Sequence, residues 1–206
     1  MAPGRGWMSY TRLYLCRHGE VCGDGRRRYN GHRDVDITDV GVRQMERLRD
    51  ILLDKPVDAV YCSDLIRTIK GAEIIGGPHG AQALSRAEFR ERGVGFWEGM
   101  SYDEIEAAYP EDWNAWLGDI VHFVPPGGES LLEVSARVLP ALNETLAAHK
   151  GKEVVLVGHG GVNRVILSHA LGLDMKNIFR IEQHYGALNI IDFYDDGMPV
   201  VKLLNG

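Results

Sequence analysis

The chain alternates between two hydrophobic patterns, short apolar runs and longer stretches in which apolar residues recur at helical spacing. The first pattern is typical of buried strands, and the second is typical of helices with one buried face. The predicted strands are 11–16, 57–62, 83–84, 153–157, 187–193 and 200–204. The predicted helices are 38–52, 63–72, 101–110, 129–150 and 162–171. Strands and helices therefore alternate, which indicates βαβ units and a mainly parallel sheet.

Polar residues at the predicted helix ends indicate how these helices begin. Thr38 and Ser63 each precede helically spaced apolar residues, so both are predicted N-caps. Ser101 and Glu104 have the spacing of a capping box, in which each side chain bonds the backbone N–H of the other residue. The long helix over 129–150 contains Pro140, which predicts a kink because proline lacks the N–H that the helix interior needs.

The order of these elements predicts an α/β fold of three layers, α/β/α, with helices on both faces of a mainly parallel central sheet. The last two strands flank Asp195-Asp196-Gly197, which is typical of a hairpin, so an antiparallel edge strand is expected near the C-terminus. No repeat, low-complexity stretch or long linker divides the chain. We therefore expect a single domain over residues 1–206, with residues 1–10 as a loose N-terminal tail.

Composition narrows the class of protein. The chain has 206 residues, of which 45% are hydrophobic and 25% are charged, as is ordinary for a globular domain. The net charge of −6 argues against general nucleic-acid binding, because that affinity needs a basic surface. No apolar run is long enough to cross a membrane, and the first residues lack the apolar segment of a secretory signal. Cys16, Cys22 and Cys62 have no metal-ligand spacing, and the apolar surroundings of Cys16 and Cys62 favour buried, reduced thiols in the cytoplasm.

Two short motifs carry the candidate chemistry, Arg17-His18-Gly19-Glu20 and Gly158-His159-Gly160-Gly161. Each motif directly follows an apolar strand, and the carboxyl ends of parallel strands form the usual ligand-binding edge of a sheet. We therefore expect His18 and His159 to meet across one pocket. Gly19 and Gly160 directly follow the histidines, and glycine lets backbone N–H groups approach an anion closely.

The remaining candidates suit the transfer of a phosphoryl group. This reaction needs a nucleophile, cations around the phosphoryl oxygens and a proton for the leaving alcohol. The two histidines can supply one nucleophile and one electrophilic partner. Arg17 and Arg67 each supply a guanidinium group, which is always charged and whose paired N–H donors suit phosphate. Arg67 follows another predicted strand end. Glu91, which precedes the apolar and aromatic segment 93–97, is the candidate acid, because such neighbours help a carboxyl group to keep its proton.

Five sequence blocks together resemble the histidine phosphatase superfamily, which has the phosphoglycerate-mutase-like fold. The blocks are 17–20 with 30–38 and Gly41, 61–68, 89–99, 126–130 and 157–161. The resemblance spans about residues 11–205 and keeps the order of the blocks. It is specific in combination, whereas any one block alone is a weak signal.

The resemblance implies a role for five residues. His18 would be the nucleophile and would form a phosphohistidine that water then hydrolyses. Arg17, Arg67 and His159 would surround the phosphoryl group. Glu91 would protonate the leaving oxygen and then activate water. This scheme requires no metal and no cofactor, and the sequence shows no obvious metal-ligand spacing.

Two positions depart from the family pattern. Family members often have Thr three residues after the nucleophile and Asn six residues after it, whereas this chain has Val21 and Asp24. The Asn commonly helps to bind phosphate, so a carboxylate at this position puts that contact in doubt. Three interpretations of Asp24 stay open: it points away, it pairs with the arginine run 26–28, or it favours a different leaving group.

Further residues are candidates for a substrate rim, together with Asp24. A solvated loop is the simpler interpretation of the run 26–28, and Arg28 is the member that best fits a rim. Asn30 follows in the same segment, and His184 belongs to a turn able to approach the pocket. The predicted cover over the site is the segment 111–126 with its two tryptophans.

The combined prediction is a cytoplasmic phosphomonoester hydrolase with a small-molecule substrate and with no nucleic-acid or membrane partner; a homodimer is one assembly considered. The segment between Gly99 and Pro126 lacks the insertions with which mutases of this family close their site, so hydrolysis is favoured over phosphoglycerate mutase activity. Residues 179–183 and 203–205 resemble the α-ribazole phosphatases of cobalamin synthesis.

Four alternatives stay open. The chain can be a phosphoserine phosphatase, a broad sugar-phosphate phosphatase, or a protein phosphohistidine phosphatase with a shallow, open site. The non-enzyme alternative is a phosphate-binding signalling module. The complete set of Arg17, His18, Arg67, Glu91 and His159 argues against that module, which would bind phosphate stably without turnover.

Overall fold

A computed structural model describes residues 9–23 and 28–206. The strands are β1 (Tyr10–Arg17), β2 (Val57–Cys62), β3 (Ala83–Ser85), β4 (Glu153–Gly158), β5 (Leu188–Tyr194) and β6 (Pro199–Leu203). The helices are α1 (Asp39–Leu52), α2 (Ile66–Gly76), α3 (Tyr102–Ala108), α4 (Pro110–Gly118), α5 (Leu131–Ala148) and α6 (Gly160–Leu171). These elements agree closely with the pattern of apolar residues, because most strands are buried runs and most helices have one buried stripe.

The described strands form one six-stranded sheet in the order β3-β2-β4-β1-β5-β6. The pairs β3–β2, β2–β4 and β4–β1 are parallel, whereas β5 is antiparallel to both β1 and β6. The sheet is therefore mainly parallel with an antiparallel C-terminal edge. This result confirms the predicted α/β fold class and the predicted C-terminal hairpin.

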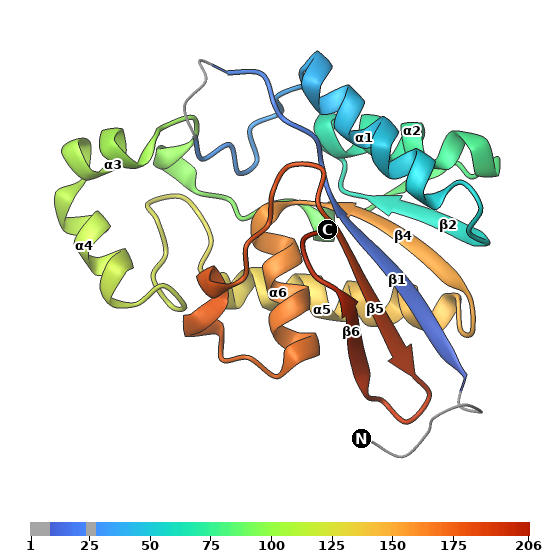
Figure 1. The fold of residues 1–206 in the computed structure, drawn as a ribbon. Helices are drawn as coiled ribbons and strands as arrows, with labels where there is room; N and C mark the ends of the chain where they lie inside the picture. The colour runs from blue at the N-terminus through green and yellow to red at the C-terminus, as the bar shows by residue number, and fades with distance from the viewer. Residues whose placement is uncertain (1–8, 24–27) are drawn as a thin grey trace.

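Helices cover both faces of the sheet (Figure 1). Successive residues of a strand point to opposite faces, and β1 shows the consequence directly. Leu13 and Leu15 pack in a core cluster with α5 and α6, whereas Tyr14 and Cys16 pack in a second cluster with α1 and α2. Since both faces are buried, the central strands are apolar throughout rather than alternating.

The capping predictions are confirmed in two places and wrong in one. Thr38 caps α1 by accepting a hydrogen bond from the N–H of Gly41, and Ser101 forms a capping box with Glu104 at the start of α3. Ser63 does not cap α2, because the helix begins three residues later, at Ile66. The side chain of Ser63 contributes to the candidate site instead.

The helices α3 and α4 lie beside the sheet rather than over either face (Figure 1). They belong to the segment 94–126, which we call the α3–α4 lobe. This lobe has its own core cluster, built around Val94, Trp97, Ile105 and Trp116. The predicted cover over the site is therefore a separately packed unit beside the sheet.

Some boundaries differ from those expected. The strand β1 already includes Tyr10, so the predicted tail over 1–10 is too long by at least this residue; residues 1–8 lie outside the described part. Helix α6 begins at Gly160, two residues before the predicted start, and Pro140 lies inside α5, which continues past it. Across residues 9–23 and 28–206, no helix combines the length and the apolar character that crossing a membrane requires.

Candidate active site

The parallel pairing of β1 with β4 places the two histidines side by side. Arg17 is paired with Gly158 in this ladder, and each of these residues is directly followed by a histidine. The N–H of His18 donates to the carbonyl of Gly158 at 3.1 Å, and the ring centroids of His18 and His159 lie 5.2 Å apart. The expected meeting of the two histidines at the carboxyl edge of the sheet is therefore present.

His18 is held in one tautomer. Its Nδ1 lies 2.8 Å from the carbonyl oxygen of Gly19, which can only accept, so Nδ1 carries the proton and Nε2 keeps its lone pair. The residue is 4% exposed. Burial, followed by the charges of Arg17 and Arg67, lowers the pKa of His18 well below 6.5. The imidazole is therefore neutral at neutral pH, as a nitrogen nucleophile must be.

His159 is fixed by two side chains from the β2–α2 region. Arg67 Nε donates to His159 Nδ1 at 3.3 Å, so Nε2 carries the proton and donates to Ser63 Oγ at 2.8 Å. Ser63 Oγ is also 2.7 Å from the hydroxyl of Thr68 on α2. Burial, followed by the charge of Arg67, lowers the pKa of His159 well below 6.5. Ser63 thus orients a histidine rather than capping a helix.

Arg67 is a buried cation beside both histidines. It is 1% exposed, and besides His159 it donates to the carbonyl of Arg33 and to the carbonyl of Gly31, each at 2.7 Å. These neutral acceptors hold the guanidinium without neutralising it. Burial lowers its pKa, yet an arginine keeps its charge. The first turn of α2 therefore delivers a fixed positive charge to the site.

Arg17 adds a second cation. Its Nη1 donates to the carbonyl of Gln183 at 2.6 Å, and its guanidinium lies 4.1 Å from the ring centroid of Tyr185. A Cβ added at Gly160 would lie 3.4 Å from the Arg17 guanidinium carbon and 3.3 Å from Arg164 Nη1. The glycine after His159 therefore leaves room for two arginine side chains at the start of α6.

Glu91 reaches the same site from a loop. Its carboxylate accepts from the N–H of Gly161 at 3.0 Å and from the N–H of Arg92 at 2.9 Å. A side chain at Gly161 would overlap this carboxylate, so a larger residue there would push Glu91 out of its present position. The first turn of α6 thus fixes the position of the candidate acid.

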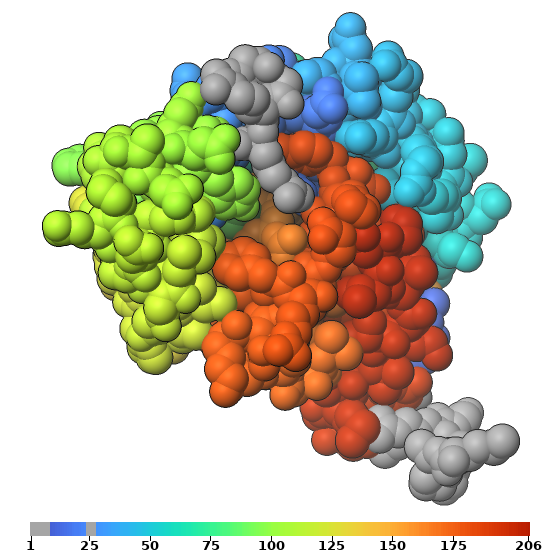
Figure 2. Space-filling view, turned by 60° about the vertical axis from the view of Figure 1, so that its left-hand side comes forward, coloured from blue at the N-terminus to red at the C-terminus, as the bar shows by residue number. Residues whose placement is uncertain are grey.

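These groups border a cavity of about 530 Å³ between the sheet edge and the α3–α4 lobe. Figure 2 shows the surface hollowed between the lobe and the segment around α6 and residues 175–185. The polar end of the cavity is lined by Arg17, His18, Arg67, Glu91, Gly160 and Gly161. The side toward the α3–α4 lobe is lined by the Arg28 guanidinium and by aromatic side chains, namely Tyr29, Trp97, Tyr102, Trp113, Trp116 and Phe179.

The other predicted site residues divide into three groups. Arg28 and Asn30 line the cavity, and the Arg28 guanidinium donates to the carboxylate of Glu104 at 2.7 Å. Gly19 and His184 do not line it. Gly19 packs against the backbone at the start of α1, where an added Cβ would overlap. The side chain of His184 is exposed, and its neighbour Tyr185 lines the cavity instead. Asp24, like Arg26 and Arg27, lies outside the described residues.

Several site residues were missed by the sequence analysis. Arg164 lines the cavity and donates to the carbonyls of Ile181 and Gly160. It follows Gly160 by one helical turn, and that spacing was a usable signal. The contact of Ser63 with His159 had no comparable signal, because it depends on how three strand ends lie next to one another.

Two of the three cysteines are buried, as the sequence predicted. Cys16 and Cys62 are buried, Cys22 is exposed, and all three thiols are free. Burial raises the pKa of the Cys16 and Cys62 thiols to about 12, so both are inert at neutral pH. Within residues 9–23 and 28–206, no three His, Cys, Asp or Glu side chains are grouped so that they could hold a metal ion.

The fold and the site together define a class of protein: an α/β phosphatase with a histidine pair, two arginines and a carboxylate at the carboxyl edge of its sheet. The profile of the histidine phosphatase superfamily (branch 1) matches residues 13–206, and the chain belongs to this family.

Three comparisons illustrate its neighbours. Phosphoglycerate mutase-like protein 4 of Arabidopsis thaliana is 34% identical over 79% of this chain and 72% of its own length. Glucosyl-3-phosphoglycerate phosphatase of Mycolicibacterium vanbaalenii is 32% identical over 82% of this chain and 78% of its own length. The crystal structure of the α-ribazole phosphatase from Shigella flexneri superposes with a TM-score of 0.86 at 26% identity, covering 95% of this chain and 96% of that one.

The buried histidines predict a specific loss of stability in mild acid. Both pKa values are lowered in the folded protein, so below the unfolded value of about 6.5 the unfolded chain binds more protons than the folded one. The free energy of unfolding is therefore expected to fall as the pH drops from 6.5 to 5, at a slope approaching about 2.7 kcal/mol per pH unit for two protons. Urea unfolding at pH 7.5, 6.5, 5.5 and 5.0 measures this slope. His18→Asn is expected to lose about half of it, and an unchanged slope in that variant would contradict the assignment.

Proposed function

We propose that this protein hydrolyses phosphomonoesters through a phosphohistidine formed at Nε2 of His18. The observation that carries the proposal is the tautomer of His18: its Nδ1–H bonds the carbonyl of Gly19, and burial keeps the ring neutral. Arg17 and Arg67 supply positive charge beside it, where the equatorial phosphoryl oxygens gain negative charge in the transition state.

The reaction has two steps. In the first, His18 Nε2 bonds to phosphorus while the bond from phosphorus to the alcohol oxygen breaks, and the Glu91 carboxyl group gives its proton to that oxygen. In the second, water attacks the phosphohistidine, its proton passes to the Glu91 carboxylate, and the bond between nitrogen and phosphorus breaks. The products are the alcohol and inorganic phosphate, and both side chains return to their starting state. Neither step needs a metal ion or a cofactor.

His159 has the role of an electrophilic partner. A substrate dianion beside it favours the protonated imidazole, because an opposite charge at short range stabilises the charged form. Ser63 Oγ already accepts from Nε2, so the second proton belongs on Nδ1. That N–H is then available to a phosphoryl oxygen, provided that Arg67 also turns its Nε–H toward the anion.

The aromatic end of the cavity favours a particular leaving group. Aromatic side chains line this end, and Trp113 and Trp116 lie with ring centroids 4.9 Å apart. Such a wall suits a leaving group that carries a planar or apolar ring. We therefore propose α-ribazole 5′-phosphate, whose benzimidazole base is planar and apolar, as the substrate of a cytoplasmic enzyme. The structural similarity to the α-ribazole phosphatase of Shigella flexneri supports this choice.

A broad sugar-phosphate phosphatase is the second candidate. The similarity to the glucosyl-3-phosphoglycerate phosphatase of Mycolicibacterium vanbaalenii supports it, as do the arginines Arg92 and Arg164 in the cavity wall. Hydrolysis is favoured over mutase activity, because a mutase must shield its phosphoenzyme from water, and this chain has no insertion in the α3–α4 lobe for that purpose.

The test is phosphate release from a panel of esters with a chelator present throughout. The panel contains α-ribazole 5′-phosphate, phosphoserine, 3-phosphoglycerate, a hexose phosphate and 4-nitrophenyl phosphate. A kcat/KM for α-ribazole 5′-phosphate at least about 10²-fold above the other natural esters is the expected result. A hexose phosphate or phosphoserine turned over equally well contradicts the proposed substrate. Tight phosphate binding without turnover of any ester contradicts hydrolysis and favours a phosphate-binding module.

Phe179 provides a direct test of the aromatic wall. Its side chain lines the cavity, is 51% exposed, and contacts Trp116 edge to face with ring centroids 5.8 Å apart. Phe179→Ala is expected to lower kcat/KM for α-ribazole 5′-phosphate by up to about tenfold, because one aromatic contact is worth about 0.5–1.5 kcal/mol. Hydrolysis of phosphoserine is expected to change less than twofold. The matched control is Phe96→Ala, since Phe96 is 68% exposed and does not line the cavity; an equal loss in both variants would remove Phe179 from the binding wall.

A further inference from the structure

Glu91 lies on irregular backbone, so neither a helix nor a strand fixes the position of its side chain. It follows the short 3₁₀ turn Ala87–Phe89 and precedes the turn Gly95–Trp97, with no helix or strand between them. A general acid must lie within hydrogen-bond reach of the oxygen that it protonates. The backbone around Glu91 therefore needs support from elsewhere in the molecule.

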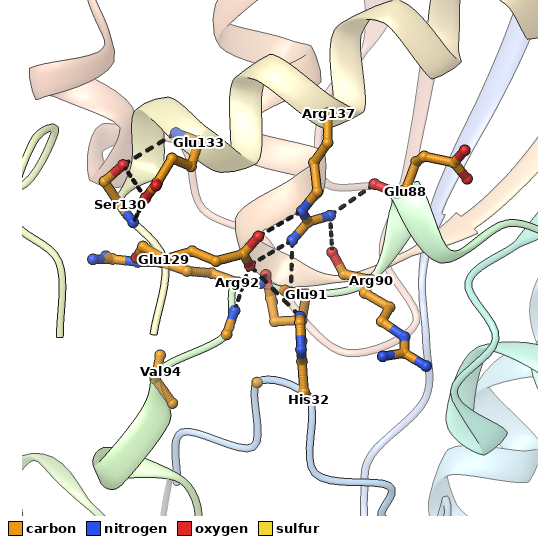
Figure 3. A network of polar contacts seen from close by, with 12 residues as sticks. His32, Glu88, Arg90, Glu91, Arg92, Val94, Glu129, Ser130, Glu133 and Arg137 are labelled. Atoms are coloured by element: carbon orange, nitrogen blue, oxygen red, sulfur yellow. Dashed lines mark hydrogen bonds and ion pairs between the residues drawn. The ribbon is translucent and has the colours of Figure 1, made fainter. Parts of the chain in front are cut away.

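Arg137 on α5 supplies this support. Its Nη1 donates to the carbonyls of Glu88 and Arg90, each at 2.7 Å, and its Nη2 donates to the carbonyl of Glu91 at 3.0 Å (Figure 3). One rigid guanidinium thus holds three carbonyl groups of the segment that ends in the candidate acid. Because the fork is planar, the three carbonyls are fixed relative to one another as well as to α5.

Glu129 completes the arrangement on the other side of Glu91. Its carboxylate accepts from Arg137 Nε and Nη2, both at 2.9 Å, and from the N–H of Gly93 at 2.8 Å. The backbone N–H of Glu129 also donates to the carbonyl of Gly93 at 2.8 Å. Arg137 therefore uses all five of its N–H donors on this network, and the segment is held both before and after the acid.

The network does not itself reach the phosphate end of the cavity. Neither Arg137 nor Glu129 lines the cavity, whereas Glu91 and Arg92 do. Arg92 is held in turn, because its Nε donates to the carbonyl of Glu129 at 2.6 Å. The hydrogen bonds of Arg137 therefore reach the site through the Glu91 segment, and its charge adds a minor contribution to the lowered pKa of His159.

We propose that Arg137, braced by Glu129, is a positioning residue that sets the Glu91 carboxyl group for proton transfer to the leaving oxygen. This inference rests on the proposed function, in which Glu91 is the acid. The competing view is that Arg137 only ties α5 to a neighbouring loop. The two views differ in one measurable respect: a misplaced acid harms poor leaving groups far more than good ones, whereas a loosened fold harms both equally.

The experiment compares two esters, 4-nitrophenyl phosphate, whose leaving group needs little protonation, and an alkyl phosphate, whose leaving group needs it fully. Glu91→Gln is the reference, and kcat/KM is compared because it covers only the steps up to release of the alcohol and not the later hydrolysis of the phosphohistidine. The variant is expected to lower kcat/KM for the alkyl ester 10²–10³-fold and for the aryl ester less than tenfold. Arg137→Met is expected to follow the same pattern, with a loss of about 30–100-fold against less than fivefold. Arg137→Lys is expected to recover part of the alkyl activity. The double variant with Glu91→Gln is expected to be no slower on the alkyl ester than Glu91→Gln alone.

Arg86→Met is the matched control. Arg86 joins the same 3₁₀ turn to α5, since its guanidinium binds the carboxylates of Glu88 and Glu144 rather than the Glu91 segment. Its removal is expected to change both rates less than twofold. If Arg86→Met reproduces the alkyl-specific loss, or if Arg137→Met slows both esters equally, the positioning role is overturned.

Two further outcomes separate this inference from the proposed function. If Glu91→Gln shows no dependence on the leaving group, Glu91 is not the acid and both proposals fail together. If Glu91→Gln shows the dependence and Arg137→Met does not, only the positioning role fails. Should Arg137→Met not fold, Glu129→Gln takes its place, because it weakens the brace while keeping its shape. That variant is expected to show an alkyl-specific loss of about fivefold, and an equal effect on both esters overturns the role.

Discussion

Replacing His18 with alanine is expected to lower kcat for every phosphomonoester substrate by at least about 10⁴-fold. The imidazole is the nucleophile of the proposed reaction, and no neighbouring group can replace it: the Nδ1 of His159 accepts from Arg67, and its Nε2 donates to Ser63. Effects of this size are usual when the nucleophile of a covalent mechanism is removed. Steady-state phosphate release with the α-ribazole ester and with 4-nitrophenyl phosphate measures the loss.

Trapping the intermediate makes this prediction specific. Rapid quenching with alkaline detergent is expected to capture a phosphoryl group on the wild-type protein that is stable to alkali and labile to acid, as for phosphohistidine. His18→Ala should capture none. His184→Ala is the matched control, because His184 is exposed and lies outside the cavity lining, and its rate is expected to stay within twofold of wild type. Wild-type turnover in His18→Ala would exclude the mechanism.

Replacing Arg67 with methionine is expected to lower kcat/KM about 10³-fold with little loss of stability. The activity falls because a buried positive charge next to both histidines no longer stabilises the transferring phosphoryl group. The stability changes little for a separate reason. Three hydrogen bonds to neutral acceptors are lost, at about 1 kcal/mol each, but the cost of burying a cation without a hydrogen-bonded carboxylate is relieved by a similar amount.

Binding of inorganic phosphate tests the charge of Arg67 without any turnover. Phosphate at 100 times its Kd is expected to stabilise the wild-type protein by about 2.7 kcal/mol, since it binds only the folded state. Thermal unfolding with and without phosphate measures this gain, and Arg67→Met should lose most of it. Arg86→Met, which removes a partly exposed arginine away from the cavity, should keep it. A full phosphate response in Arg67→Met would show that Arg67 does not contact the anion.

The sheet and the position of the candidate site at its edge were predictable for a simple reason. Fully buried strands are short apolar runs, and the residue after such a run lies at the edge of the sheet, so His18 and His159 were placed correctly without any knowledge of distances. The residues that contact these histidines were harder to predict from the sequence. Ser63 looked like a cap, because a serine before a helix and a serine in a turn give the same local pattern.

The support of Glu91 was beyond the reach of sequence reasoning. Arg137 occupies an ordinary position on an amphipathic helix, and Glu129 precedes a strong capping box at Ser130, so both have adequate local explanations. Their true partners are backbone carbonyls of a distant irregular segment, which carry no side-chain signature at all. A contact made to backbone leaves no pattern that one sequence alone can reveal.

The separate core of the α3–α4 lobe has a consequence for how such proteins diversify. The proposed catalytic groups come from strand ends, from the first turns of α2 and α6, and from the loop that Arg137 holds. Most of the aromatic wall belongs to the lobe and is packed on its own cluster around Trp97. Substitutions inside that cluster can therefore reshape the room for the leaving group while the phosphate end stays unaltered. The proposed phosphate end and most of the aromatic wall therefore belong to separately packed parts of the molecule, so variants with new substrates are best sought by randomising the lobe alone.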